Sequence, residues 1–199
     1  MMQRYLLDIF VVIYNVLFNN PTHNLLRALE KFGGIYMDTD VEILRPSDEL
    51  MELPAFTGYE ASQKNAPVTG LMASAPHGVW VREQLAYYEC KHFVKPDGTL
   101  DMTTNTVTIA NIMVAGGFKI DGKYQVYKND MHVFPVDYFC PLTSTKILKL
   151  TENTYCIHHF AGSWVERTRG QIIKAWIFDH ILGRRLTDKL VQIKRKLLG

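Results

Sequence analysis

The sequence predicts a mixed α/β domain. Helix-type and strand-type apolar patterns alternate along its 199 residues, and glycine pairs or asparagine-proline turns separate them. The composition, with 47% hydrophobic and 21% charged residues, is that of a globular protein large enough to bury a core. No repeat, low-complexity tract or Ser/Gly-rich linker divides the chain, so we expect a single domain over residues 1–199.

The predicted elements follow one another from residue 21 onward. Leucines recur at helical spacing from Leu25 until Gly33-Gly34 ends the helix, and the short apolar run 35–37 is a strand that leaves directly from those glycines. Further strands are expected at 55–59, 68–73, 124–127, 131–134 and 154–160, and further helices from Pro76, over 106–114, 164–182 and 186–198.

Residues 6–18 form an almost wholly apolar run with three interpretations. Asp8 and Asn15 interrupt the run, no small-residue cleavage site follows it, and a membrane-spanning helix needs about 20 apolar residues. A buried core helix is the simplest interpretation. Insertion into a membrane surface and a cleaved signal are the alternatives.

Charge and cysteine content exclude several classes of function. The 22 Lys and Arg residues oppose 20 Asp and Glu residues, and a formal charge of +2 predicts no nucleic-acid partner. Cys90, Cys140 and Cys156 are odd in number and form no Cys-x-x-Cys pair. They argue against a zinc site or a disulfide framework and favour a reducing compartment, which here means the cytoplasm.

The C-terminal stretch 184–199 is basic along one helical face. It holds six Lys and Arg residues against Asp188 alone, opposite a stripe of leucine and isoleucine. A solvated surface helix is the simple interpretation. Peripheral docking on an anionic inner membrane is the alternative.

Asp38-Thr39-Asp40 is the first candidate for chemistry. Side chains alternate along a strand, so the two carboxylates beyond the strand at 35–37 can converge on one ligand. Paired oxygen ligands suit Mg²⁺ or Mn²⁺, which would bridge the phosphates of a nucleotide. A solvated turn is the alternative interpretation of so short a motif.

Several blocks resemble a known family more specifically. Residues 27–41 (RALEKFGGIYMDTDV), 42–46 (EILRP), 137–141 (DYFCP) and 157–164 (IHHFAGSW) carry the likeness. Together they resemble the DXD sugar transferases of bacterial capsular polysaccharide synthesis, the alpha-mannosyltransferases and, more distantly, the large clostridial glucosylating toxins. The likeness covers about residues 21 to 165.

The resemblance implies a GT-A fold, in which a mixed sheet is flanked by helices, and a metal-dependent transfer that retains anomeric configuration. The donor would be a UDP- or GDP-sugar and the acceptor a surface, capsular or lipid-linked glycan. Asp38 and Asp40 would be the catalytic pair, with Asp40 holding Mn²⁺ or Mg²⁺. Asp38 would contact donor ribose or sugar hydroxyls together with Tyr36, for which a place in the core is the alternative.

The second block supplies the remaining candidates. Neighbours on a strand face opposite sides, so one of His158 and His159 can reach the metal or the diphosphate while the other packs elsewhere. Ser163 would bond phosphate, and Trp164 would close over the donor base as part of a lid. A Trp that only anchors the following helix is the alternative.

The chain also departs from the family pattern. Where the family carries an acid and an arginine that grip the donor, this sequence has Thr22 and Leu25, and Thr69 replaces a common asparagine. The family's first strand and helix have no counterpart, so we expect a sheet that lacks part of the N-terminal nucleotide-binding half. Residues 6–18 would cover the exposed edge or reach a second copy in a symmetric dimer. A non-catalytic remnant that acts as a binding or assembly protein, at a membrane surface in one version, is therefore the alternative function.

Overall fold

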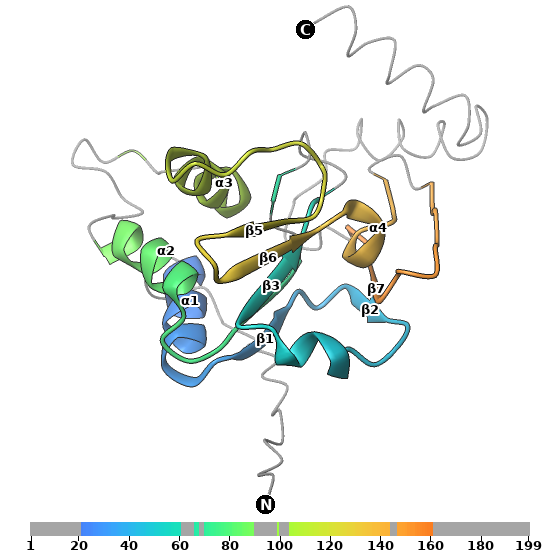
Figure 1. Ribbon diagram of the computed structural model, residues 1–199, viewed down its shortest axis with the longest axis horizontal. Helices are drawn as coiled ribbons and strands as arrows, with labels where there is room; N and C mark the ends of the chain where they lie inside the picture. Colours follow the sequence, from blue (N-terminus) through green and yellow to red (C-terminus); the bar gives the residue numbers. More distant parts are fainter. Residues whose placement is uncertain are drawn as a thin grey trace, which may run out of the picture.

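The computed structural model describes residues 21–60, 66–67, 70–89, 99, 104–143 and 147–160 of the 199-residue chain. Over these residues the fold is mixed α/β, as predicted, with a five-stranded sheet, a two-stranded sheet and flanking helices (Figure 1). The predicted segments 6–18, 164–182 and 184–199 lie outside the described residues, as do Thr69, Cys90, Ser163 and Trp164.

The larger sheet has the strand order β1-β4-β3-β6-β5. Its strands are β1 (Gly34–Met37), β3 (Ala55–Gly58), β4 (Leu71–Ser74), β5 (Gln125–Tyr127) and β6 (Met131–Phe134). β3 pairs with β6 in parallel, and every other pairing in this sheet is antiparallel. The carboxyl ends of β1, β3 and β6 therefore share one edge of the sheet, and β4 and β5 begin there.

Three helices cover one face of this sheet. They are α1 (Pro21–Phe32), α2 (Val79–Glu89) and α3 (Asn105–Ala115), and α1 and α2 lie side by side (Figure 1). Fully buried side chains from each helix, Leu26, Trp80 and Ile109, join a core that also takes in alternate residues of the strands. This is the amphipathic arrangement that the leucine spacing in 25–32 predicts.

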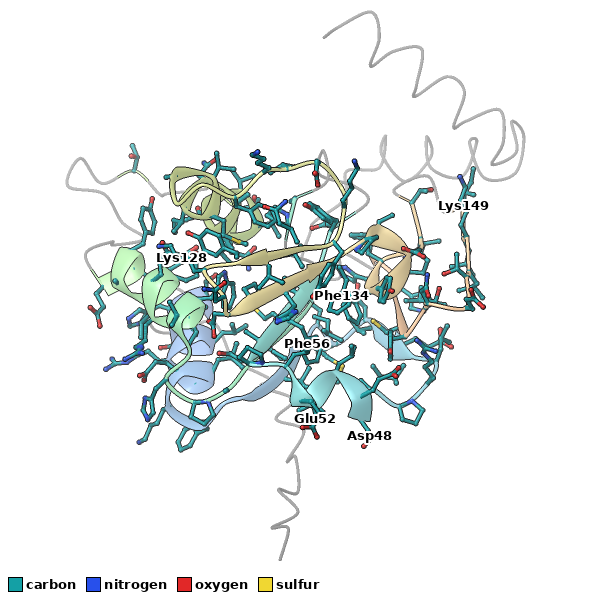
Figure 2. All side chains as sticks on the ribbon, in the orientation of Figure 1. Asp48, Glu52, Phe56, Lys128, Phe134 and Lys149 are labelled. Carbon is teal, nitrogen blue, oxygen red and sulfur yellow. The ribbon has the colours of Figure 1, made fainter. Side chains whose placement is uncertain are left out.

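A second core fills the other face. It is built around Phe56 and Phe134 and closed by Leu50 of the short 3₁₀ helix η1 (Asp48–Glu52) and by Phe139 of α4 (Val136–Phe139). Phe56 and Phe134 lie within the body of the domain, whereas Asp48 and Glu52 stand on the outer surface of η1 (Figure 2).

The smaller sheet pairs two segments that are far apart in the sequence. β2 (Val41–Ile43) and β7 (Cys156–His158) are antiparallel, with Val41 opposite His158. Cys140 and Cys156 are buried. Cys140 directly follows α4, and Cys156 is the first residue of β7, where its thiol donates to the Phe139 carbonyl at 3.4 Å. Among the described helices, none has both the length and the apolar content that crossing a bilayer requires.

Among the predicted boundaries that differ from the structure, two have a clear local reason. The second helix begins at Val79 rather than Pro76, because His77 adopts a φ of +60° and the carboxylate of Asp130 accepts the Trp80 amide proton at 2.6 Å. The last strand stops at His158, since Phe160 has left the extended region with a φ of +50°. The elements β2, η1 and α4 were not predicted. All three are short, and β2 is largely exposed.

Candidate metal centre

A tight joint between α1 and β1 sets the course of the chain toward the site. Gly33 has a φ of +67°, and a Cβ on it would lie 2.6 Å from the Cδ atom of Pro76. Only glycine can turn the chain so sharply against this proline. β1 then runs straight to the sheet edge, where the Asp38 amide donates to the Gly70 carbonyl at 2.7 Å.

Three side chains from two strand ends meet at this edge. Asp38, Asp40 and His158 each offer one ligand atom, and these atoms all lie within 4.8 Å of one another. His158 Nε2 is 3.3 Å from Asp40 Oδ1 and 3.6 Å from Asp38 Oδ2. Two carboxylate oxygens and one imidazole nitrogen could hold a divalent metal ion.

The β2–β7 ladder is what carries His158 to the carboxylates. Val41 is the strand partner of His158, and the His159 amide donates to the Asp40 carbonyl at 3.0 Å, which continues the pairing beyond the strand. His158 is buried in the cluster. His159 lies on the outside, where its Nε2 is 2.8 Å from Glu42 Oε2. The structure thus brings one histidine of the pair to Asp38 and Asp40 and leaves the other out.

Gly70 forms one wall of the cluster. A Cβ on it would lie 2.8 Å from Asp38 Oδ2 and 3.0 Å from the His158 ring, so the site closes around a position that only glycine can occupy. Gly70 was not among the predicted site residues. Its signal in the sequence is a glycine placed directly before the strand β4 and directly after Thr69.

Tyr36 is attached to the site through Asp38. Its hydroxyl donates to Asp38 Oδ1 at 2.6 Å, while its ring packs against the first core. Burial, and then the Asp38 charge, raise the pKa of the Tyr36 hydroxyl, so that it remains a donor at any physiological pH. Both interpretations of Tyr36 therefore have a structural counterpart, the ring in the core and the hydroxyl at the site.

Burial also acts on Asp38 itself. It raises the pKa of this carboxyl above its ordinary value, against the opposing effects of the Tyr36 hydrogen bond and of His158. Two carboxylates and a buried imidazole thus share a small, partly desolvated space. A bound dication would relieve the repulsion between the two negative charges.

The remaining predicted contacts are placed as follows. Thr22 and Leu25 lie on α1, and Leu25 packs against the first core rather than presenting a polar group. Ser163 and Trp164 fall in the part of the chain that is not described.

No family model, no curated protein and no solved structure matches this chain.

Proposed function

We propose that this protein is a metal-dependent glycosyltransferase. It transfers a sugar from a nucleotide-sugar donor to a surface or capsular glycan with retention of anomeric configuration, on a GT-A scaffold. The observation that carries this proposal is the convergence of Asp38, Asp40 and His158 on one point. Support also comes from the resemblance of the blocks around these residues to the DXD sugar transferases.

The place of the cluster in the fold supports a ligand site. It lies beyond the carboxyl end of β1, at the edge that β1 shares with the carboxyl ends of β3 and β6. In open α/β sheets, ligands bind at this edge, where loops rather than ladder hydrogen bonds surround the strand ends. Among the described residues, the side chains of Asp38 and Asp40 are partly exposed at this edge, which supports access by a ligand.

The proposed mechanism assigns a distinct task to each side chain. When bound, Mn²⁺ or Mg²⁺ would supply positive charge where negative charge develops on the leaving diphosphate. Asp40 and His158 would hold the cation, and Asp38, fixed by the Tyr36 hydroxyl, would contact ribose or sugar hydroxyls of the donor. Ser163 and Trp164 are proposed to bind phosphate and to cover the donor base.

The acceptor side of the proposal draws on the tail of the sequence. A basic face over 184–199 would dock the protein on the inner face of the cytoplasmic membrane, where lipid-linked glycans would be within reach. The enzyme would then work in the cytoplasm. If residues 6–18 reach a second copy of the chain, it would do so as a symmetric dimer.

One observation favours a second candidate, a non-catalytic remnant. Leu25 stands where the family has a cation that grips the donor, and its partly buried side chain packs against the first core. A chain with an apolar residue packed at this position lacks one donor contact. It could keep the scaffold and the cation site as a binding or assembly protein.

Donor hydrolysis separates the two candidates. The full chain is incubated with UDP-glucose or GDP-mannose and Mn²⁺, with EDTA as the control, and released nucleoside diphosphate is measured. The enzyme releases diphosphate only when Mn²⁺ is present. Binding of Mn²⁺ and nucleoside diphosphate without release would support the remnant, and no binding of either would contradict both.

A further inference from the structure

Phe160 follows the two histidines in an unusual backbone conformation. Its φ is +50°, in the left-handed region that a bulky L residue rarely adopts. Its ring centroid lies 4.1 Å from that of His158, at an interplanar angle of 33°. Residues two apart on a regular strand are separated by about 6.7 Å. The left-handed turn is therefore what brings the two rings into contact.

The other ring nitrogen of His158, Nδ1, determines what can orient this ring. A ligating histidine usually donates its other ring N–H to a carboxylate, a carbonyl or water, and that hydrogen bond fixes the ring orientation. Within the described part of the chain, His158 Nδ1 is buried and has no hydrogen-bond partner. Packing is left to orient the ring.

Two neighbours provide that packing. Gly70 closes one side, since a Cβ there would lie 3.0 Å from His158 Nδ1 and from its Cε1. Phe160 covers a face of the imidazole. With both in place, Nε2 is the ring nitrogen that faces Asp38 and Asp40.

We propose that Phe160 is a positioning residue of the cation site. Its ring holds His158 Nε2 toward the two carboxylates, in place of the hydrogen bond that orients most ligating histidines. Strained conformations persist where the surrounding structure enforces them, typically beside functional groups, and the left-handed Phe160 is such a case. This role rests on the cation-binding function proposed above and names a further residue that serves it.

The test is a Mn²⁺ titration by isothermal calorimetry, combined with the melting temperature of the metal-free protein. Phe160→Asn removes the ring, while asparagine adopts the left-handed conformation more easily. We expect the Mn²⁺ affinity to fall about tenfold. The melting temperature should stay within about 3 °C of the parent value. Phe160→Tyr keeps a ring over His158 and should keep the affinity.

Two controls separate positioning from a structural role. His77→Asn relaxes another left-handed residue, with a φ of +60°, away from the cluster, and should leave the Mn²⁺ affinity unchanged. In a His158→Ala background, Phe160→Asn should cost no further affinity, because the residue acts through His158. The same tenfold loss in both backgrounds would overturn the role.

The outcomes distinguish this inference from the function on which it rests. A parent that binds Mn²⁺ while Phe160→Asn binds it equally well overturns the positioning role alone. A parent that binds no Mn²⁺ overturns the proposed function and the role together. In the metal-free protein, the ring protons of His158 should resonate upfield because of the Phe160 ring, and Phe160→Asn should abolish that shift.

Discussion

The centre of the large sheet and its junction with the small sheet are built in contrasting ways. All residues of β3 and β4 are buried, and the centre is packed on both faces by aromatic and aliphatic side chains. At the junction, β1 is only half-buried and β2 and β7 have three residues each. The junction holds two neighbouring carboxylates, a left-handed phenylalanine and an imidazole nitrogen with no hydrogen-bond partner among the described residues.

The difference separates stability from function. Apolar burial in the centre provides the free energy of folding, and a small domain has little to spare. The junction contributes less apolar burial and concentrates features that cost free energy without a ligand. Functional sites are commonly placed in such regions, which a stable scaffold then tolerates. A cation between Asp38, Asp40 and His158 would join the edge of the large sheet to the small one.

Truncation in the centre should have the largest effect on stability. Phe56 is 1% exposed and packs against Phe139 with ring centroids 6.0 Å apart. Phe56→Ala should lower the free energy of unfolding by about 3–5 kcal/mol through lost burial and a cavity. Urea denaturation measures it. Val126→Ala on the exposed side of β5 is the control, and an equally small loss for both would contradict the contrast between centre and surface.

At the junction, a substitution should act on the ligand response instead. Mn²⁺ with UDP at about 100 times the dissociation constant stabilises a protein by about 2.7 kcal/mol. Asp40→Ala should abolish this rise in melting temperature, and Asp38→Ala should reduce it less. EDTA should remove it from the parent. Asp48→Ala replaces an exposed acid on η1 and serves as the control. An unchanged response in Asp40→Ala would contradict the assignment of Asp40.

Much of the centre could be predicted from the sequence, because its signals are local. The leucines lie within α1, the apolar run lies within β6, and the adjacent glycines at 33 and 34 mark the junction between α1 and β1. The adjacency of Asp38 and Asp40 is likewise local. The choice of His158 over His159 follows from the β2–β7 register, which joins residues more than a hundred positions apart. Two of the three residues of β2 are exposed, so the sequence has no apolar alternation there from which a strand could be predicted.

Gly70 and Phe160 show the same limit in another form. Each acts at the site through its contact with the His158 ring. No sequence pattern predicts either contact. A glycine at the start of a strand and a phenylalanine after two histidines have many uses. Only the distances reveal that one clears space for the cluster and the other covers its imidazole.

A smaller effect at the junction should come from the Tyr36 hydroxyl. Tyr36→Phe keeps the ring in the core and removes the 2.6 Å hydrogen bond to Asp38. Partners that orient the side chains of a metal site contribute about tenfold or more to affinity or activity. Asp38 is proposed to contact the donor, so we expect the affinity for UDP in the presence of Mn²⁺ to fall about tenfold, as measured by calorimetry. Tyr124→Phe removes a comparable hydrogen bond, to His132, and should leave the affinity unchanged. Equal affinities for Tyr36→Phe and the parent would make this hydroxyl structural only.

The smallest expected effect is on stability. It tests whether a buried polar group without a hydrogen-bond partner destabilises the centre of the domain. Gln84 on α2 is fully buried within the described structure, and neither its amide oxygen nor its nitrogen has a hydrogen-bond partner. Methionine has a similar length and no polar group to desolvate. Gln84→Met should therefore raise the free energy of unfolding by about 1 kcal/mol, or the melting temperature by about 2–4 °C.

Gln125 is the matched control for this substitution. Its amide both donates to and accepts from the backbone of Lys119, at 3.1 Å in each case, so Gln125→Met should destabilise the protein. The melting temperature should rise in Gln84→Met and fall in Gln125→Met. Mn²⁺ affinity should be unchanged in both variants. In the centre an unpartnered polar group would then be a cost that can be removed. At the junction the same feature, His158 Nδ1, belongs to a side chain that we propose as a cation ligand. A loss of stability in Gln84→Met would show instead that this amide is satisfied in solution, and the contrast between the two regions would not extend to their polar groups.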